Sequence, residues 1–538
     1  MTIELPTQKN LYELYVQDFA QVKHLFEYDP SKFPVQERMD YLAGNWAGDR
    51  SALAEVLYKE NQRLGAGSLT LENISALAKE KTVAVVTGQQ TGLFTGPLLT
   101  VYKALTAIYL AQELKGKYQI KAVPVFWTAA EDHDYAEINH IHYLNAQEKI
   151  AQIKLSFKPT GTPSVGSIPA GDFCREAIAQ LAANTSFGNF KEEFISLLQE
   201  KLQESATIAD WFGKIMLSLL AEYGLIYFNP MQPELRALAK PFWKAALANQ
   251  EQIQLSLEES EHAVGQLGFK PAVQKSPFHT HLFTYDQGNR LPLLKEKGQF
   301  KAENKFWTSK DLEQMMESRP DAFSPDVLLR PILQDYLLPT LIYVAGPGEI
   351  NYWAQIKGAF KIMGAQMPIL YPRASFTIIE PEVAAKLDKY HVTDLQDLWS
   401  DFRETKEKNL AARDNLKIKE HFQLLKKELA HDLGTATAPY LEKYEDLAEL
   451  QAKNLHRIMG EIDYLESKVW QRHSQENRDL DQNFLWLQKN LYPNRHVQEN
   501  IFNILPYLFK WGPELIKNLL VEHNPIGDFS HKFIFLGS

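Results

Sequence analysis

The sequence predicts an α/β protein with a parallel sheet, joined to a long helical arm. The first observation is a βαβ pattern, with an apolar strand at residues 83–86, a helix from 98 to about 114 and a second strand at 123–127. Pro97 lies near the expected start of this helix and Gly116 just past its expected end. The second observation is a change in character after about residue 382, where long and highly charged helical patterns begin.

Composition limits the classes of protein that the chain can belong to. Its 538 residues are enough for two or more folded units, and 45% hydrophobic with 23% charged residues is ordinary for a globular protein. A net charge of −10 without a basic tract argues against a nucleic-acid partner. The single cysteine, Cys174, excludes an internal disulfide and a multi-cysteine zinc site, and no base lies beside it.

The sequence has no recognisable signal peptide or membrane-spanning segment, and this predicts where the protein is located. Its first residues lack the basic start and apolar core of a signal peptide, and no stretch reaches the roughly 18 apolar residues of a membrane span. We therefore expect a cytoplasmic protein without a membrane partner.

The remaining elements of the core follow in order. Residues 1–80 are expected to be mainly helical, ending in a helix at 70–81. A first insertion, at about 145–210, contains a strand at 150–157 and a helix at 190–202, and the core resumes with a helix at 208–222, a strand at 225–228 and a helix at 233–259. A second insertion, at about 265–310, alternates apolar and polar residues and has a turn at 286–289, which predicts a small antiparallel element. Strands at 340–345 and 369–372 complete a core of residues 1–381.

The arm, residues 382–490, carries a heptad pattern. Apolar residues recur every seven positions after residue 439, with charged residues beside them, which is typical of a coiled coil. The segment 434–439 is the only strong break that we expect in these helices. The pattern fits a helical hairpin packed on itself and a stalk for dimerisation equally well. Residues 491–538 are expected to pack back on the core.

The candidate site begins in the turn that follows the first strand. Thr87, Gly88, Gln89, Gln90 and Gly92 lie where the carboxyl ends of parallel strands meet, which is the ligand-binding edge of open α/β sheets. The turn has no P-loop lysine and does not match G-x-G-x-x-G, which argues against those two modes of nucleotide binding. Its glutamines suit a hydroxyl-rich or anionic ligand, whereas the alternative is a purely structural tight turn.

A loop rich in carboxylates follows the second strand. Asp132, His133 and Asp134 are the predicted catalytic residues, because nearby carboxylates are expected to raise the pKa of His133 and make it a general base or acid. A metal site that uses Asp132 and His133, with His140 or His142, is an alternative that we do not assign. The pair of histidines at 279 and 281 offers a weaker case of the same kind.

Polar residues near the later strands complete the predicted site. Arg330 could bind a carboxylate with two hydrogen bonds, although an internal ion pair with Asp335 is the alternative. The segment 346–349 is a second glycine turn. The other predicted substrate-binding residues are Asn139, Gln334, Asp335, Tyr352, Gln355 and Arg373.

Three motifs carry a resemblance to a known family. They are TGQQTGLFTGP at 87–97, VPVFW with EDHD and AEIN at 123–139, and SPDVLLRPILQDYLLPTLIYVAGPGEINYWAQ at 324–355. With the overall length, they make the chain similar to the bacillithiol biosynthesis cysteine-adding enzymes. The resemblance implies a Rossmann-like core with connecting insertions and a coiled-coil arm that forms a homodimer.

The resemblance also implies an activity. Members of this family are thought to join cysteine to the amino group of glucosaminyl-malate in the last step of bacillithiol synthesis. Amide formation requires an activated cysteine carboxylate, and by analogy with class I aminoacyl-tRNA synthetases this implies ATP and an adenylate. The resemblance also implies ADP bound near the junction with the coiled coil. On this scheme Arg330 binds a malate carboxylate and His133 helps to deprotonate the amine. The alternatives are a nucleotidyl- or glycosyltransferase on the same fold, or an inactive coiled-coil scaffold with a poorly polar cleft.

Overall fold

The computed structural model describes residues 2–3 and 10–537. These residues fall into two compact units. The first comprises the chain up to Ile378 together with His496–Ile534, and the second comprises Ile379–Arg495 with the residues from Phe535 onward. No described helix is both long enough and apolar enough to cross a bilayer.

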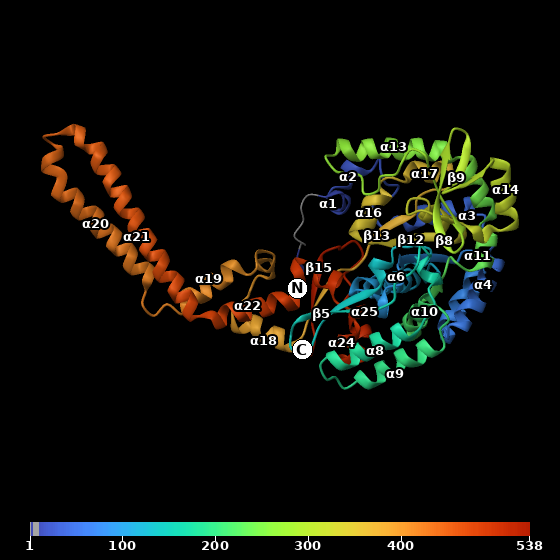
Figure 1. Cartoon of the computed structure of the whole chain (residues 1–538), viewed down its shortest axis with the longest axis horizontal. Helices are drawn as coiled ribbons and strands as arrows, with labels where there is room; N and C mark the ends of the chain where they lie inside the picture. The colour runs from blue at the N-terminus through green and yellow to red at the C-terminus, as the bar shows by residue number, and fades with distance from the viewer. Residues whose placement is uncertain (1, 4–9, 538) are drawn as a thin grey trace. The chain divides into compact units, whose positions relative to one another are not determined.

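A five-stranded parallel sheet forms the centre of the first unit (Figure 1). Its strands are β2 (Val83–Gln89), β3 (Ala122–Thr128), β6 (Ile226–Phe228), β12 (Thr340–Ala345) and β13 (Ile369–Pro372). They lie in the order β13-β12-β2-β3-β6, and every neighbouring pair is parallel. Numbered along the chain and read from β6 to β13, this is 3-2-1-4-5, the Rossmann order, so the predicted Rossmann-like core is confirmed.

Helices cover both faces of this sheet because its strands are apolar on both sides. In β2, Ala84 and Val86 join a core cluster with helices α1 (Leu11–Gln17), α4 (Arg50–Arg63) and α5 (Ser68–Leu77). The alternate residues Val83 and Val85 pack with α6 (Leu98–Lys117) and with residues between Tyr28 and Leu42. The sheet is therefore the middle of three layers, as a doubly wound fold requires.

Shorter elements surround the three layers. The N-terminal ones are β1 (Thr2–Ile3), α2 (Phe19–Val22) and α3 (Val35–Asn45). The first insertion contains α7 (Tyr135–Ile138), β4 (His140–Leu144), β5 (Ile150–Lys154), α8 (Asp172–Asn184) and α9 (Lys191–Gln203). After it come α10 (Ile208–Leu219), α11 (Pro233–Leu238), α12 (Lys240–Ala248) and α13 (Gln250–Gln266). The expected single helix at 233–259 is therefore wrong, since α12 begins afresh at Lys240 with a proline in its first turn.

The second insertion is the predicted antiparallel element. Its strands are β7 (His279–Asp286), β8 (Asn289–Glu296), β9 (Gln299–Ala302) and β10 (Lys305–Trp307), and β11 (Phe323–Pro325) adds to the far side of β7. The helices α14 (Ser309–Ser318), α15 (Arg330–Leu337), α16 (Pro347–Trp353) and α17 (Lys357–Ile362) follow. Through β11 the sheet continues directly into α15, which brings the insertion next to the parallel core.

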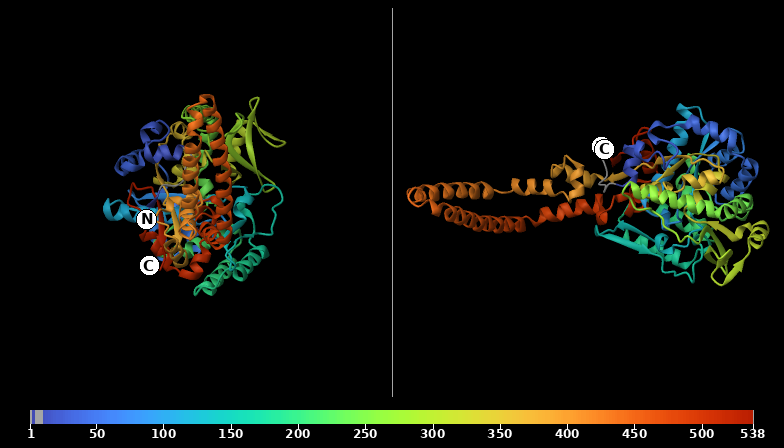
Figure 2. Two further views of the ribbon diagram at one scale, coloured as in Figure 1. Left: turned by 90° about the vertical axis from the view of Figure 1, so that its left-hand side faces the viewer. Right: turned by 90° about the horizontal axis from the view of Figure 1, so that it is seen from above.

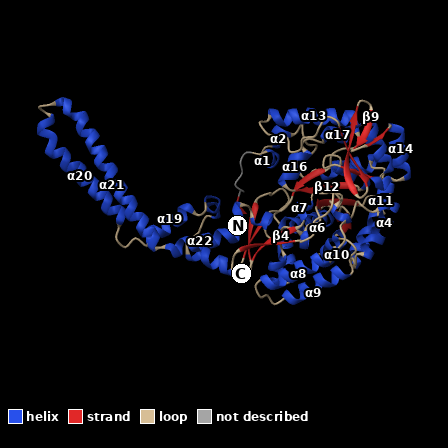
Figure 3. Cartoon of the chain, in the orientation of Figure 1, coloured by secondary structure: helices blue, strands red, loops and turns tan. Residues whose placement is uncertain are grey.

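The second unit is helical, and residues 380–495 contain no strand (Figure 3). Its helices are α18 (Pro381–Lys389), α19 (Arg403–Ala412), α20 (Ile418–Leu441), α21 (Ala448–Glu476) and α22 (Arg478–Leu491). The long helices α20 and α21 lie side by side as an antiparallel hairpin in both views of Figure 2, and Lys426 pairs with Glu466 across them at 2.5 Å. The predicted break at 434–439 is wrong, because α20 continues through Gly434 and Pro439 and the turn comes only after Leu441.

The C-terminal segment contains α23 (Gln498–Ile501), α24 (Leu505–Trp511), α25 (Glu514–Val521) and β15 (His531–Phe535). β15 pairs with β1 and joins β14 (Phe376–Ile379) in a three-stranded sheet. The backbone carbonyl of Phe502 accepts the amide hydrogen of Leu98 at 2.7 Å, at the start of α6. We expected α6 to end before Gly116, but the helix continues through it to Lys117. Gly116 lies in the last turn, where a Cβ atom would have no neighbour within 4 Å, so the helix tolerates glycine there.

Candidate functional site

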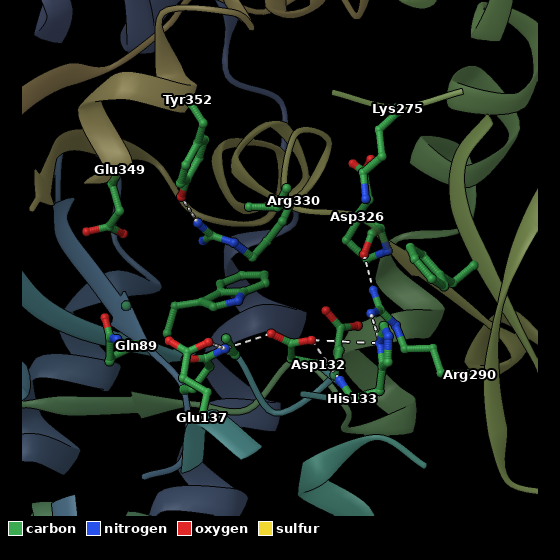
Figure 4. A pocket seen from close by; sticks show the side chains of 18 residues that line it. Gln89, Asp132, His133, Glu137, Lys275, Arg290, Asp326, Arg330, Glu349 and Tyr352 are labelled. Atoms are coloured by element: carbon green, nitrogen blue, oxygen red, sulfur yellow. Dashed lines mark hydrogen bonds and ion pairs between the residues drawn. The ribbon is translucent and has the colours of Figure 1, made fainter. Parts of the chain in front are cut away.

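A cavity of about 410 Å³ opens at the carboxyl edge of the parallel sheet. It lies where β2 ends between β3 and β12, the point at which the strand order reverses and ligands bind in doubly wound folds. Figure 4 shows its lining from close by. The lining residues are Gly88, Gln89, Gln90, Trp127, Ala129, Glu131, Asp132, His133, Glu137, Lys275, Phe283, Arg290, Pro325, Asp326, Val327, Arg330, Glu349 and Tyr352. Charged residues from four separate segments therefore meet in one cavity, which disfavours the scaffold alternative.

The end of β2 forms the floor of this cavity. The strand extends to Gln89, three residues beyond the expected end, and Gly88 pairs with Trp127 of β3. A Cβ atom at position 88 would lie 2.7 Å from the carbonyl oxygen of Trp127, so the close approach of the two strands requires glycine. Gln89 and Gln90 then line the cavity as predicted.

Gln90 links the two sides of the carboxylate loop. Its Nε2 donates to Asp132 Oδ2 at 2.8 Å and to Glu137 Oε2 at 2.7 Å. Burial alone would raise the pKa of Asp132, but the hydrogen bond from Gln90 and the charge of Arg290 hold it below its usual value. Asp132 is therefore a carboxylate at neutral pH and a weak proton acceptor.

His133 differs from the prediction. Partial burial lowers its pKa, and the nearby charge of Arg290 lowers it further, which outweighs the two aspartates that we expected to raise it. Arg290 Nη1 lies 3.2 Å from His133 Nδ1, and because a guanidinium can only donate, Nδ1 must accept. The imidazole is therefore neutral, with its remaining hydrogen on Nε2.

Arg290 comes from β8 in the second insertion and was not among the predicted residues. Its guanidinium donates to Ser324 Oγ at 3.0 Å and to the carbonyl of Pro325 at 2.6 Å, and lies 3.8 Å from the ring centre of Phe283. These contacts fix its position without an ion pair to any carboxylate among residues 10–537. The only sequence signal was the turn at 286–289, which predicts a hairpin but not which surface the hairpin faces.

Arg330, at the start of α15, lies across the cavity from the carboxylate loop. Its Nη2 donates to the hydroxyl of Tyr352 at 2.7 Å (Figure 4), and no carboxylate among residues 10–537 forms an ion pair with it. The alternative ion pair with Asp335 is wrong, because Asp335 binds the buried Arg38 at 2.5 Å instead. The charge of Glu349 also acts on Arg330, but Glu349 is itself paired with Lys103, so the Arg330 guanidinium keeps donors for an anionic ligand.

A buried ion pair supports the same wall. Lys103 of α6 pairs with Glu349 of α16, and Tyr343 donates to the second oxygen of Glu349 at 2.6 Å. Burial lowers the pKa of Lys103, and the charge of Glu349 opposes this shift. Lys103 Nζ also donates to the carbonyl of Gly88 and so connects this wall to the cavity floor.

Several predicted residues have structural roles instead. The hydroxyl of Thr87 donates to the carbonyl of Val344 inside the sheet, and Asp134 caps the first turn of α7. Gln355 is held by two hydrogen bonds with the backbone of Val273, and Gln334 accepts from Arg330 at 3.4 Å. None of these four side chains lines the cavity, nor does Asp335. Thr87, Gln334, Gln355 and Asp335 are buried in the core, whereas Asp134 is exposed.

Three further predicted residues lie in other places. Gly92 lines a neighbouring cavity of about 280 Å³. The buried Asn139 contacts His140 at the start of β4. Arg373 lies in a separate cavity of about 230 Å³, where it pairs with Glu499 at 2.6 Å. The carboxyl end of β13 is two strands from the floor of the main cavity, which explains why Arg373 does not reach it.

The histidines considered for metal binding are engaged otherwise. His279, His281 and Asp326 are close enough together to share an ion. However, His281 Nδ1 lies 2.8 Å from Asp326 Oδ2 and its Nε2 lies 2.9 Å from Gln254 Oε1, so both ring nitrogens face acceptors. Asp326 Oδ1 accepts from the backbone of Leu328 and Leu329, and the three residues thereby fix the turn that precedes Arg330.

Fold and site together define a class: a Rossmann-like α/β protein with a charged, two-sided cavity at the switch point and an appended helical hairpin. The family model described as "Bacillithiol biosynthesis BshC, N-terminal Rossmann-like domain" matches residues 1–374, and "Bacillithiol biosynthesis BshC, C-terminal coiled-coil domain" matches 376–536. The chain belongs to this BshC family. Membership confirms the predicted coiled-coil region and the predicted enzyme class, a ligase.

Curated relatives support this assignment over almost the whole chain. A protein of Desulforamulus reducens named "Putative cysteine ligase BshC" is 37% identical, over 97% of this chain and 96% of its own length. Proteins of the same name from Symbiobacterium thermophilum and Anoxybacillus flavithermus are 34% and 31% identical, over 97% and 99% of both chains.

Proposed function

We propose that the protein joins the carboxyl group of cysteine to the amino group of glucosaminyl-malate, the last step of bacillithiol synthesis. The observation that carries this proposal is the separation of charge inside the cavity. Arg290, Arg330 and Lys275 line it without an ion-pair partner among residues 10–537, whereas Asp132 and Glu137 lie on the β3–α7 side. The other lining carboxylates are already engaged, since Glu131 pairs with Arg236, Asp326 with His281 and Glu349 with Lys103. Glucosaminyl-malate carries both charges, with two malate carboxylates attached through the glycosidic oxygen at C1 and an ammonium group on the neighbouring C2 of the sugar.

This pattern sets the orientation of the substrate. The malate carboxylates lie against Arg330, whose planar guanidinium is held by Tyr352 and can donate two parallel hydrogen bonds. The ammonium group then lies toward Asp132 and Glu137. The Nε2–H of the neutral His133 is left as a donor for a sugar hydroxyl or a carbonyl oxygen, so its role is to orient rather than to deprotonate.

Amide formation from a free carboxylate requires an activated acyl group. We propose a nucleoside triphosphate, ATP, as the source of activation, because hydrolysis of its phosphate bonds is needed to drive the ligation. The alternative, a transferase that uses a nucleotide sugar, fits the same fold. However, the cavity has cationic side chains on one side and carboxylates on the other, and this arrangement favours a substrate that carries both charges.

The helical arm is proposed to hold two copies of the chain together. Ile458 and Leu465, seven residues apart, are exposed on α21, although hydrophobic side chains at heptad spacing are normally covered. Leu450 on α21 and Leu424 on α20 are exposed as well. A homodimer would cover them. Light scattering should give twice the chain mass for the protein, and one chain mass after replacement of Leu450 and Leu465 by glutamate.

The test of the activity is a product assay by mass spectrometry, with cysteine and glucosaminyl-malate, with and without ATP and magnesium. Arg330→Lys keeps the charge but loses the paired hydrogen bonds. A charged hydrogen bond is worth about 1.5–3 kcal/mol, so KM for glucosaminyl-malate should rise about 10-fold or more. Arg175→Lys, on the exposed face of α8, is the matched control and should leave KM unchanged. No product from the folded protein under any of these conditions would refute the proposal.

A further inference from the structure

The second cavity, of about 280 Å³, adjoins the main one. Gln89, Gln90 and Glu137 line both cavities, so these three side chains form a shared wall. The remaining lining residues of the second cavity are Gly92, Gly96, Pro97, Leu99, Thr100, Ile138, His140, Ile141, His142, Asn500 and Ile501. An enzyme that joins two molecules needs two binding spaces that meet where the new bond forms, and the shared wall lies at this meeting point.

Glu137 is the ionisable residue of the shared wall. It lies on α7 after the carboxylate loop, and Gln90 Nε2 holds its Oε2 at 2.7 Å, which leaves the other oxygen free to bind a ligand. The side chain remains open to solvent, so a proton that it accepts can pass to water. Its position relative to Asp132 is fixed, because the same Gln90 nitrogen donates to both carboxylates.

The two neighbouring candidates are less suited to accept a proton. His133 Nδ1 already accepts from Arg290, and its Nε2 carries a hydrogen. Asp132 Oδ1 accepts the backbone hydrogen of His133 at 2.7 Å and its Oδ2 accepts from Gln90. Both oxygens of Asp132 are thus engaged in bonds that favour the ionised form.

We propose that Glu137 is the general base that takes a proton from the substrate ammonium group, at the wall between the two cavities, with the cysteinyl group in the second cavity. This inference rests on the proposed function. The ammonium group gives one proton to Glu137 and becomes an amine. The amine nitrogen then forms a bond to the carbonyl carbon of an activated cysteine carboxyl, an acyl phosphate or acyl adenylate. The phosphate or AMP leaves with the electron pair of the broken C–O bond, and the second N–H proton passes to water.

The charges around Glu137 favour this role. Partial burial raises its pKa above the usual value and the charges of Asp132 and Asp134 raise it further, while the hydrogen bond from Gln90 opposes the shift. On the far side of the shared wall the ionisable groups are His140 and His142 of β4. In the main cavity the other ionisable lining residues are Glu131, Asp132, His133, Lys275, Arg290, Asp326, Arg330, Glu349 and Tyr352. A base works best when its pKa approaches the working pH, so the direction of this shift is the useful one.

The test compares Glu137→Gln, Glu137→Asp and the unchanged protein in steady-state kinetics. Glutamine keeps an oxygen that can accept from Gln90 but cannot take a proton. We expect kcat to fall about 10²–10⁴-fold, which is the usual contribution of a general base. Calorimetric affinity for glucosaminyl-malate should change less than about 5-fold. Aspartate should restore part of kcat, and the acidic limb of the pH profile should be lost in the glutamine variant only.

A control and a second variant separate the parts of the proposal. Glu148→Gln, in the exposed β4–β5 turn, should match the unchanged protein. Leu99→Trp places a large side chain in the second cavity from the start of α6, on a residue that does not line the main cavity. It should raise KM for cysteine several-fold without changing KM for glucosaminyl-malate.

The possible outcomes are distinct. If Glu137→Gln retains kcat within about 3-fold, or retains the acidic limb, Glu137 is not the base, even though the proposed function stands. If Leu99→Trp raises KM for glucosaminyl-malate instead, the assignment of the second cavity is wrong. If the unchanged protein makes no product, the proposed function fails and this inference fails with it.

Discussion

The buried ion pair between Arg38 and Asp335 allows a prediction that separates stability from catalysis. Arg38 is completely buried, and its guanidinium donates to Asp335 Oδ1 at 2.5 Å, to the carbonyl of Thr340 at 3.1 Å and to that of Gln366 at 2.9 Å. Burial raises the pKa of Asp335 to about 6, and the charge of Arg38 limits this rise. The pair joins helix α3 to the end of α15 and lies outside the cavity.

Asp335→Ala leaves the Arg38 charge buried with two carbonyls but no counter-charge. Loss of one member of a buried pair costs about 3–5 kcal/mol, so the free energy of unfolding of the first unit should fall by that amount. The double variant Arg38→Met with Asp335→Leu removes both charges and should be more stable than Asp335→Ala alone. Under conditions where the protein is folded, KM for glucosaminyl-malate should be unchanged in both variants.

Urea denaturation followed by tryptophan fluorescence measures these changes. Trp46 is a local probe, since its indole nitrogen donates to the carbonyl of Asp335 at 2.9 Å. A destabilisation of Asp335→Ala below about 1 kcal/mol would mean that water reaches Arg38, contrary to the stated burial cost. If Asp335→Ala instead raises KM for glucosaminyl-malate without loss of stability, Asp335 binds substrate, as the sequence predicts.

Three other predictions test the site and its support. Gly88→Ala should destabilise the first unit by about 1–3 kcal/mol in thermal unfolding, because the new Cβ meets backbone, whereas Gly348→Ala, with nothing within 4 Å, is the control. Arg290→Met should raise the pKa of His133 in an NMR titration, since it removes a cation that lowers that pKa, and an unchanged value would refute the assigned tautomer. His279, His523 and His531 are buried with pKa values of about 4, below the ordinary 6.5, so the stability that they contribute is present above pH 6.5 and is lost as pH falls toward 4. Each should change the free energy of unfolding by about 1.4 kcal/mol per pH unit in that window, and His523→Asn should reduce the slope measured by urea denaturation.

The parallel core could be predicted because its signals are local. Residues 340–345 and 369–372 were predicted exactly as β12 and β13, since buried β-branched and aromatic runs between turns have few other structures. The helical arm was also evident from its spacing. The break predicted at 434–439 does not occur, because packing between α20 and α21 compensates for Gly434 and Pro439. Local helix propensity does not include such packing.

The site was only partly predictable, because its composition depends on tertiary contacts. Gln89 ends β2, Gln90 follows it and Asp132 lies in the loop after β3, and the rule for parallel strand ends placed them correctly. Arg290 and Lys275 belong to the second insertion. The local sequence does not predict how this insertion packs on the core, so neither residue could be placed in the site. The sequence shows the aspartates next to His133 but not that Arg290 lies beside it. The predicted direction of the His133 pKa shift was therefore wrong.

The glycine turn after β2 depends on residues from the opposite end of the chain. Phe94 and Thr95 have φ values of 49° and 77°, which are costly for residues other than glycine. The side chain of Asn503 holds them by donating to the carbonyls of Phe94 at 2.7 Å and Gly96 at 2.6 Å. A growing polypeptide therefore cannot complete this turn until more than nine-tenths of it has been translated. During synthesis the two hydrogen bonds from Asn503 can form only after residues 379–495 have also been made.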